Sequence, residues 1–262
     1  MNDALHTIAP QRVREHVGEA EWAARVQLAA VYRLLHRYGM TDLIYNHATL
    51  RVPDSEHILI NAYGYLYNEV CASNLLKIDL EGRVVLAPED PHGYGVNVAG
   101  YVIHSAVHRA RPDVHCVIHT HTRAGMAVSA MADGLLPLTQ TAMRFHGRIG
   151  YHDYESVAID LDEQARLVAD LGSHDAMILR NHGLLAVGPS AAQAFNTMYW
   201  LEMACKAQVD AMAGGARLHL PPEAIREKTA HLYDRTTRRA FGELEWPAML
   251  RELDRIDPGF RN

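Results

Sequence analysis

The sequence predicts one α/β domain whose helices and strands pack in layers. Three observations indicate this fold class: an amphipathic helix near the amino terminus, a series of short β-like runs after it, and the overall order helix, strands, helix, strands, helices. The chain has 262 residues, 48% hydrophobic and 21% charged, so it can bury a large core without disulfide staples. No internal repeat, low-complexity tract or long linker divides it.

The first predicted helix spans residues 21–38. Val26, Ala30 and Leu34 fall on one face at helical spacing, and Gly39 follows as a stop. We therefore expect the domain to open with an amphipathic helix.

Short β-like runs follow the first helix. They read ATLRV, HILIN, LLKIDL and VVLA, and Glu81-Gly82 between the last two is typical of a hairpin turn. A second helix is predicted over 97–110. It ends at Arg111-Pro112, because a residue before proline is pushed out of the helical region.

The second half repeats this alternation. The β-rich run VHCVIHTH leads into a helix with the sequence RAGMAVSAM. Two further strands, AMILR and LLAVG, flank a tight segment at 181–183. A long helix is predicted over 190–213, with more helix in the charged carboxyl-terminal part.

Composition excludes several function classes. The net charge of -6 and the lack of a basic stripe argue against nucleic acid as a partner. No apolar run is long enough to span a membrane, so no membrane partner is expected. The amino terminus is polar and unlike a secretory signal, and the three cysteines are widely spaced without a CxxC pair. We therefore expect a reducing, cytoplasmic setting.

The chain has 17 histidines, and position must separate the functional ones from the rest. His119 and His121 end a predicted strand with only Thr120 between them. Side chains two apart on a strand project to the same face, so both imidazoles can reach one ion. A catalytic transition-metal site commonly uses three protein ligands, and His182, at a glycine turn between two strands, is the best third candidate.

Other histidines fit this interpretation less well, and an HxH pair alone is weak evidence of a metal site. His104 and His108 have helical i, i+4 spacing but lack the glutamate of a zincin motif. We expect His104 to pack inside and His108 to lie near the surface. His146 and His152 fall in a predicted loop, where either a pocket or the surface is possible.

Several stretches together resemble the class II aldolase/adducin family, in wording closest to the head domain of adducin and its bacterial relatives. They read YNHATLRV, NAYGYLYNEVCASNLLKIDLEG, NVAGYVIHSAVHRARPDVHCVIHTHTRAGMAVSAM, YHDYE and LRNHGLLAVG. The resemblance covers about 23–214 and leaves a carboxyl-terminal helical extension at 215–262, within one domain over 1–262.

The resemblance implies a three-layer α/β/α sandwich around a mainly antiparallel central sheet, and a homotetramer with metal sites near the subunit interfaces. It also implies a divalent metal held by His119, His121 and His182. Zinc is the expected ion, with manganese, iron or cobalt as alternatives.

The departures from the family pattern bear on the reaction. Sugar-phosphate cleaving members carry a catalytic glutamate nineteen residues before the first ligand, preceded by two serines that help to hold phosphate. Here those positions are Gly100, Val98 and Ala99. Their side chains offer neither a proton carrier nor a phosphate donor, although backbone N–H groups at a helix start could still bind an anion. The sequence therefore argues against a sugar-phosphate aldolase or a pentulose-phosphate epimerase.

We expect instead a metal-dependent lyase that cleaves or decarboxylates a small, non-phosphorylated hydroxy, keto or aromatic acid. One alternative is a non-catalytic, adducin-like binding module of the actin and cytoskeleton type. It is weakened by the absence of a lysine-rich tail before Asn262. A metal-dependent epimerase is a third possibility.

Six further residues are candidates for the site, although a structural role is at least as well supported for the two arginines and better supported for the other four. An imidazole or a phenol can transfer protons when its environment adjusts its pKa, and arginine forks and amides can hold a carboxylate. The catalytic candidates are His146, Tyr101 and Tyr233, the last from a neighbouring subunit. The substrate-binding candidates are Asn46, Arg123 and Arg144.

Overall fold

One mixed sheet forms the centre of the protein, as seen in a computed structural model that describes residues 6–90, 92–155 and 162–262. Within these residues nine strands follow the order β1-β5-β4-β3-β2-β6-β9-β8-β7. Only the outermost pairs, β1–β5 and β7–β8, are parallel, which confirms a mainly antiparallel sheet. The strands are β1 (His6–Ile8), β2 (His47–Arg51), β3 (Ile58–Asn61), β4 (Leu75–Ile78), β5 (Val84–Pro88), β6 (Cys116–Thr120), β7 (Gly150–His152), β8 (Ala176–Leu179) and β9 (Gly183–Gly188).

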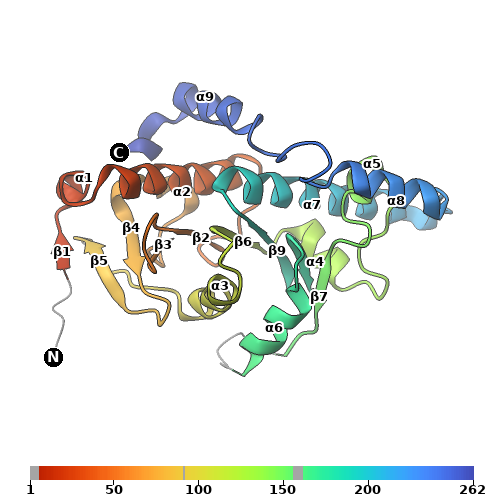
Figure 1. The fold of residues 1–262 in the computed structure, drawn as a ribbon, viewed down its shortest axis with the longest axis horizontal. Helices are drawn as coiled ribbons and strands as arrows, with labels where there is room; N and C mark the ends of the chain where they lie inside the picture. The colour runs from red at the N-terminus through yellow and green to blue at the C-terminus, as the bar shows by residue number, and fades with distance from the viewer. Residues whose placement is uncertain (1–5, 91, 156–161) are drawn as a thin grey trace.

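Helices cover both faces of this sheet, as the sandwich prediction required. In Figure 1, α2 and α7 lie along one face while α3 and α6 lie along the other. The helices are α1 (Val13–His16), α2 (Glu19–Arg37), α3 (Val98–Ala110), α4 (Arg123–Ser129), α5 (Gln140–Met143), α6 (Glu163–Leu171), α7 (Ala191–Met212), α8 (Glu223–Leu232) and α9 (Trp246–Ile256). The predicted helix at 21–38, the hairpin at Glu81-Gly82 and the long helix at 190–213 are all present.

The period-two alternation of strand side chains sorts the core into two faces. Ala48 and Ile118 belong to the apolar cluster under α2 and α7. Val117 and Leu185 belong instead to the cluster under α3 and α6. A third cluster lies on β3 and β4, around Ile58 and its neighbours. Every residue of β6 is buried, because helices pack on both of its sides.

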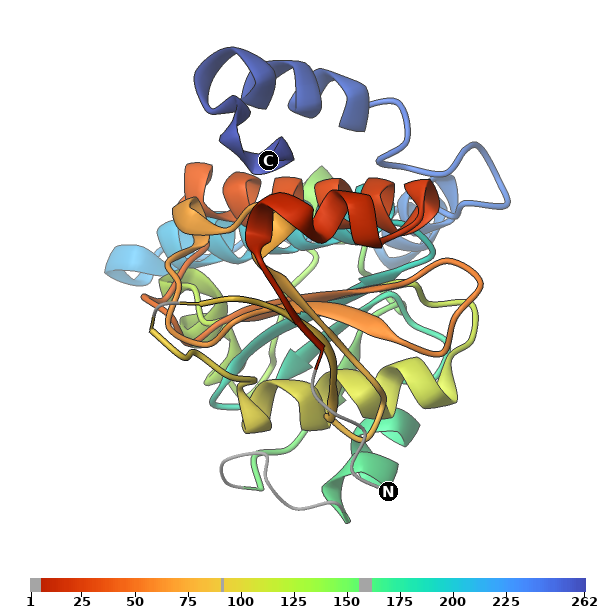
Figure 2. The same cartoon turned by 90° about the vertical axis from the view of Figure 1, so that its left-hand side faces the viewer.

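The carboxyl-terminal segment adds a layer outside α2. Figures 1 and 2 both show α9 lying over α2 on the side away from the sheet. Trp246 is buried there and donates its indole N–H to Gln27, and Arg33 forms an ion pair with Asp257. The described residues contain no helix that is both long and apolar enough to cross a membrane.

Two histidine placements differ from the sequence prediction. His104 is buried as expected, but His108 is buried too, with only 1% of its surface exposed. The reason is its partner: Thr49 of β2 lies within 2.9 Å of His108 Nε2, so the buried face of α3 extends one turn further. His152 lies on β7 rather than in a loop, where it contacts Asp170 and Glu163.

Candidate metal centre

The three predicted ligand histidines lie at the end of β6 and in the turn that leads into its neighbour β9. His119 is in β6, His121 follows the end of that strand, and His182 lies in the turn between β8 and β9. This turn is tight: Asn181 takes a left-handed conformation with φ of 55°, which asparagine tolerates better than most residues. Gly183 begins β9 so close to β6 that a Cβ atom on it would lie 2.3 Å from the Thr120 carbonyl oxygen.

The imidazoles of these three histidines converge. The Nε2 atom of His121 lies 2.7 Å from His119 Nε2 and 2.9 Å from His182 Nε2. One nitrogen from each ring falls within a group spanning no more than 4.8 Å. The structure thus brings together the residues that the sequence selected.

Hydrogen bonds on the far side of two of these rings select the tautomer. His119 Nδ1 donates to the Leu184 carbonyl at 2.9 Å, and His121 Nδ1 lies 3.1 Å from a carboxylate oxygen of Asp42. Such partners commonly orient metal-binding histidines and leave Nε2 free to bind. Sequence analysis missed Asp42, because a carboxylate 79 positions away from its partner leaves no local pattern.

Electrostatics favour a cation at this point. Burial, reinforced by the other imidazoles, keeps the pKa of His119 well below its usual range, and burial with the nearby His121 and His152 lowers the pKa of His182 to about 4. A ring that carries its one hydrogen on Nδ1, the nitrogen that faces Leu184 in His119 and Asp42 in His121, presents a bare lone pair at Nε2. Lone pairs 2.7 Å apart repel, so this donor set suits a metal ion that accepts them.

A fourth imidazole, that of His47, lies beside the cluster. His47 is the register partner of His119 across β2 and β6, and the two ring centroids are 5.1 Å apart. A Cβ atom at Gly100 would come within 2.7 Å of His47 Cδ2. The signal for this residue was the alternation of His47 and Thr49 in the run HATLR, which sets both on one strand face.

The other predicted site residues differ in their distance from the cluster. Asn46 is adjacent to His47 in sequence, is 1% exposed, and has no hydrogen-bond partner for its amide within the described residues. Arg123 begins α4 and is exposed. Tyr101 packs against Gly82 in the β4–β5 turn, as part of the apolar cluster on β3 and β4.

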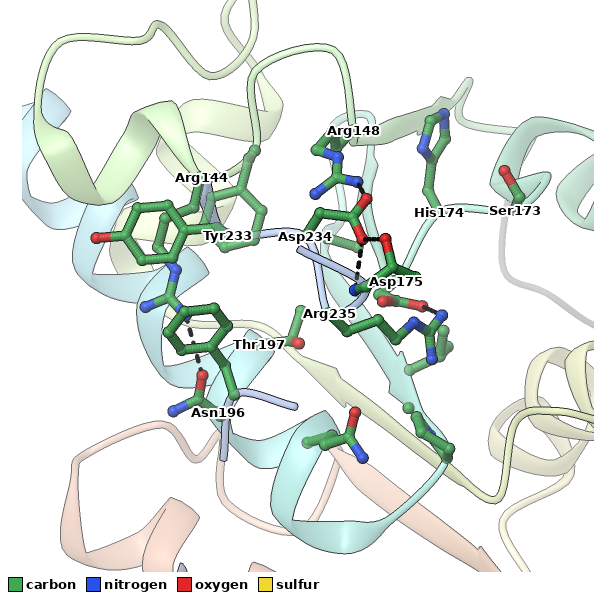
Figure 3. A pocket seen from close by; sticks show the side chains of 18 of the residues that line it. Arg144, Arg148, Ser173, His174, Asp175, Asn196, Thr197, Tyr233, Asp234 and Arg235 are labelled. Atoms are coloured by element: carbon green, nitrogen blue, oxygen red, sulfur yellow. Dashed lines mark hydrogen bonds and ion pairs between the residues drawn. The ribbon is translucent and has the colours of Figure 1, made fainter. Parts of the chain in front are cut away.

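Arg144, Tyr233 and His146 lie in another part of the molecule. Arg144 and Tyr233 line a cavity of about 460 Å³, shown in Figure 3, together with Ala176 and Gly188 at the ends of β8 and β9 opposite to His182. The Arg144 guanidinium donates to Asn196 and stacks 4.5 Å from the Tyr233 ring centroid. His146 Nε2 lies 2.6 Å from a carboxylate oxygen of Glu223. Within one chain, the structure does not bring these three residues to the histidine cluster.

Comparison with known sequences identifies the family of proteins to which this fold and this histidine cluster belong. The chain belongs to the class II aldolase and adducin family: the model of the class II aldolase and adducin N-terminal domain matches residues 26–209. A Pseudomonas aeruginosa protein provisionally named aldolase class 2 protein is 46% identical, over 98% of this chain and 99% of its own length. Alpha-adducin of Rattus norvegicus is 40% identical over 93% of this chain, which spans only 34% of that adducin.

Solved structures agree with this assignment. An aldolase II superfamily protein from Pseudomonas syringae superposes with a TM-score of 0.88 and 48% identity, covering 95% of this chain and 99% of its own. An L-fuculose 1-phosphate aldolase from Glaciozyma antarctica gives a TM-score of 0.81 at 26% identity, with 93% of each chain covered.

Proposed function

We propose that this protein is a divalent-metal-dependent carbon–carbon lyase acting on a small, non-phosphorylated hydroxy, keto or aromatic acid. The observation that carries the proposal is the convergence of three histidine Nε2 atoms, two of them with the tautomer that leaves Nε2 bare. A bound ion, with zinc expected and manganese, iron or cobalt as alternatives, would supply Lewis-acid stabilisation of negative charge on a substrate oxygen.

The chain's own residues have defined tasks in this proposal. His119, His121 and His182 hold the ion as neutral ligands, and Asp42 orients His121. Asn46 remains a substrate-binding candidate because it adjoins His47 and its buried amide has no partner in the described residues; the amide atoms are enclosed, so binding would require the chain around them to open. The sequence Val98-Ala99-Gly100 supports a substrate without phosphate.

We propose further that the protein works as a homotetramer in the cytoplasm. This assembly would give Arg144, Tyr233 and His146 a route to the reaction, since within their own chain they are engaged elsewhere. Tyr101 and Arg123 also remain candidates under this condition, that the assembly brings them to the reaction.

The test is turnover by protein loaded with zinc or manganese, assayed against a panel of hydroxy, keto and aromatic acids. We expect cleavage or decarboxylation of at least one member, and loss of that activity in His119→Ala. If fully loaded protein neither binds nor converts any member, the proposal is wrong. Product mass separates a lyase from an epimerase, because an epimerase leaves the substrate mass unchanged.

An adducin-like binding role is the second candidate, favoured by the 40% identity to alpha-adducin. Co-sedimentation with actin filaments tests it. Saturable binding that persists in His119→Ala would favour assembly over catalysis.

A further inference from the structure

The cavity shown in Figure 3 lies at the end of the strand pair β8–β9 that is farther from the histidine cluster. Its volume of about 460 Å³ is in the usual range for sites that bind small molecules. Ala176 begins β8 and Gly188 ends β9, whereas His182 lies in the turn at the opposite end of both strands. At about 3.4 Å per residue, roughly 17 Å of β9 separates Gly188 from that turn. The cavity is therefore separate from the candidate metal centre within one chain.

Three arginines line this cavity, and two of them have carboxylate partners there. Arg148 forms an ion pair with Asp234, and Arg235 lies 3.1 Å from a carboxylate oxygen of Asp175. Figure 3 shows both pairs. The third arginine, Arg144, has no carboxylate within ion-pair distance among the described residues. These five side chains together carry an excess of one positive charge, and it lies at Arg144.

Aromatic rings surround the Arg144 guanidinium but leave most of its N–H groups without a hydrogen-bond partner. The ring centroids of Tyr233, Trp200 and Phe241 lie 4.5, 5.1 and 5.2 Å from its central carbon. Such rings attract the positive charge but supply no oxygen acceptor. Of five N–H groups, one donates to the Asn196 side-chain oxygen at 3.1 Å within the described residues. The other nitrogens of Arg144 are absent from the enclosed atoms that lack a partner, so a ligand in the cavity can reach them.

The next charged groups around Arg144 do not supply the missing anion. Glu245 attracts the charge of Arg144 and Arg239 opposes it, but these two bind each other, with Arg239 Nη1 3.0 Å from Glu245 Oε2. A proton on His174, which also lines the cavity, would add to the positive excess. Burial lowers the pKa of Arg144 to about 10, which leaves the guanidinium charged at neutral pH.

A carboxylate fits the open side of this guanidinium. The planar fork of arginine N–H groups matches two carboxylate oxygens, and such charge-assisted bonds are among the strongest hydrogen bonds in proteins. An excess of one positive charge suits a monoanion. A phosphate dianion would gain the same partner but would also lie near Asp175 and Asp234 in the same cavity.

We propose that this cavity is a second ligand site, which binds a small monocarboxylic acid through the guanidinium of Arg144. The site needs neither the metal nor a neighbouring subunit, so the inference goes beyond the proposed function. Arg144 has this role within its own chain.

The first test compares ligands on the full-length wild-type protein by isothermal titration calorimetry. We expect benzoate to bind about 10- to 100-fold more tightly than benzamide, which has nearly the same shape without the charge. Inorganic phosphate should bind more weakly than benzoate. Benzamide or phosphate that binds as tightly as benzoate would overturn the inference, and so would benzoate that does not bind.

A chelator locates this binding relative to the histidine cluster. We expect benzoate to bind the cavity equally well in zinc-loaded and in chelator-treated protein, because the cavity does not contact the three histidines. Benzoate binding that disappears with the chelator would place the acid at the metal centre and overturn the inference.

The second test uses a matched pair of variants. Arg144→Lys keeps the charge but removes the fork, and we expect it to weaken benzoate binding about 10-fold. Arg235→Lys is the control in the same cavity. It should leave the affinity nearly unchanged, because the lysine can still pair with Asp175. Equal effects of the two substitutions would contradict the role of Arg144. Thermal unfolding checks that both variants are folded, and the wild-type ligand comparison decides the inference if either is not.

The two proposals fail in different ways. Protein that takes up no metal would refute the proposed function, and benzoate binding would still be measurable. Metal-loaded, active protein that binds no benzoate after chelator treatment would refute only the second site.

Discussion

His121 and Asp42 show how a single hydrogen bond selects the nitrogen that faces the cluster. The Asp42 carboxylate takes the Nδ1 side of the ring, which frees Nε2 for a metal. Asp42 precedes β2 in a segment that sequence analysis left without a role. The convergence of the three histidines was predictable from the HxH spacing and the glycine turn, whereas the contact with Asp42 was not, because it is non-local.

Replacing Asp42 should therefore weaken metal binding without removing a ligand. We expect Asp42→Ala to lower zinc affinity by about 10- to 100-fold, the usual cost of losing such a partner. Asp42→Asn keeps an acceptor and should lose less. Competition with a chromogenic chelator measures the affinity, and Asp210→Ala, which removes an exposed acid on α7, is the control. Equal affinities in all four proteins would refute the role of Asp42.

The effect of replacing Gly100 on stability depends on its neighbour His47. A glycine inside a helix normally gains about 0.5–1 kcal/mol of stability on change to alanine. Here the new Cβ would lie 2.7 Å from His47 Cδ2, so we expect Gly100→Ala to lose about 1–3 kcal/mol in urea unfolding. Adding His47→Ala makes room and should remove that penalty. A gain in the single variant would contradict this packing.

The strand pair β6–β9 is the element that holds the site together. Both strands are buried throughout, and the predictions for β6, β8 and β9 were reliable because their apolar runs are long and bounded by clear turns. The three-residue strand β7 was missed. Its pairing with β8 depends on register with a distant segment, and its own residues carry no β pattern.

The close approach of Gly183 in β9 to the backbone of β6 predicts the effect of replacing this glycine. A Cβ at Gly183 would lie 2.3 Å from the Thr120 carbonyl oxygen, and backbone cannot move aside as a side chain can. We expect Gly183→Ala to cost about 3 kcal/mol, at the upper end of overpacking, and to lower zinc content. Gly95→Ala is the matched control, since nothing lies within 4 Å of its new Cβ. Similar unfolding curves for the two variants would show that the strands can separate freely.

Across the protein, buried neutral histidines link stability to pH. The folded-state pKa of His108, about 3, lies below the ordinary value of 6.5, so the unfolded chain binds the proton first as pH falls. Stability is therefore full above pH 6.5 and is lost as pH falls towards 3. His108 alone should remove about 1.4 kcal/mol per pH unit through that window, and Arg51, His104 and His115 are the charged or titratable groups around it.

Denaturant unfolding of metal-free protein at several pH values measures this effect. We expect His108→Gln to flatten the slope of unfolding free energy against pH by about one proton relative to wild type. Only the two slopes are compared, so a difference in the unfolding free energy of wild type and variant at a single pH does not affect the test. Parallel slopes would mean that His108 is protonated in the folded protein.

The sandwich architecture and the sheet's mainly antiparallel character followed from the sequence and its resemblance. The hydrogen bonds that join β2 to α3 could not be predicted from the sequence. His47, Thr49 and the α3 histidines come into contact only when β2 and α3 pack together. The surface placement predicted for His108 failed for the same reason: helical spacing alone does not show where a buried face ends.

The most direct test of the account is the metal content of freshly purified protein, measured by plasma mass spectrometry in wild type, His119→Ala and His182→Ala. His115→Ala, which changes an exposed histidine just before β6, is the control. We predict about one equivalent of metal per chain in wild type and control, and its loss in both ligand variants. No metal in wild type, even after reloading with zinc or manganese, would contradict the account.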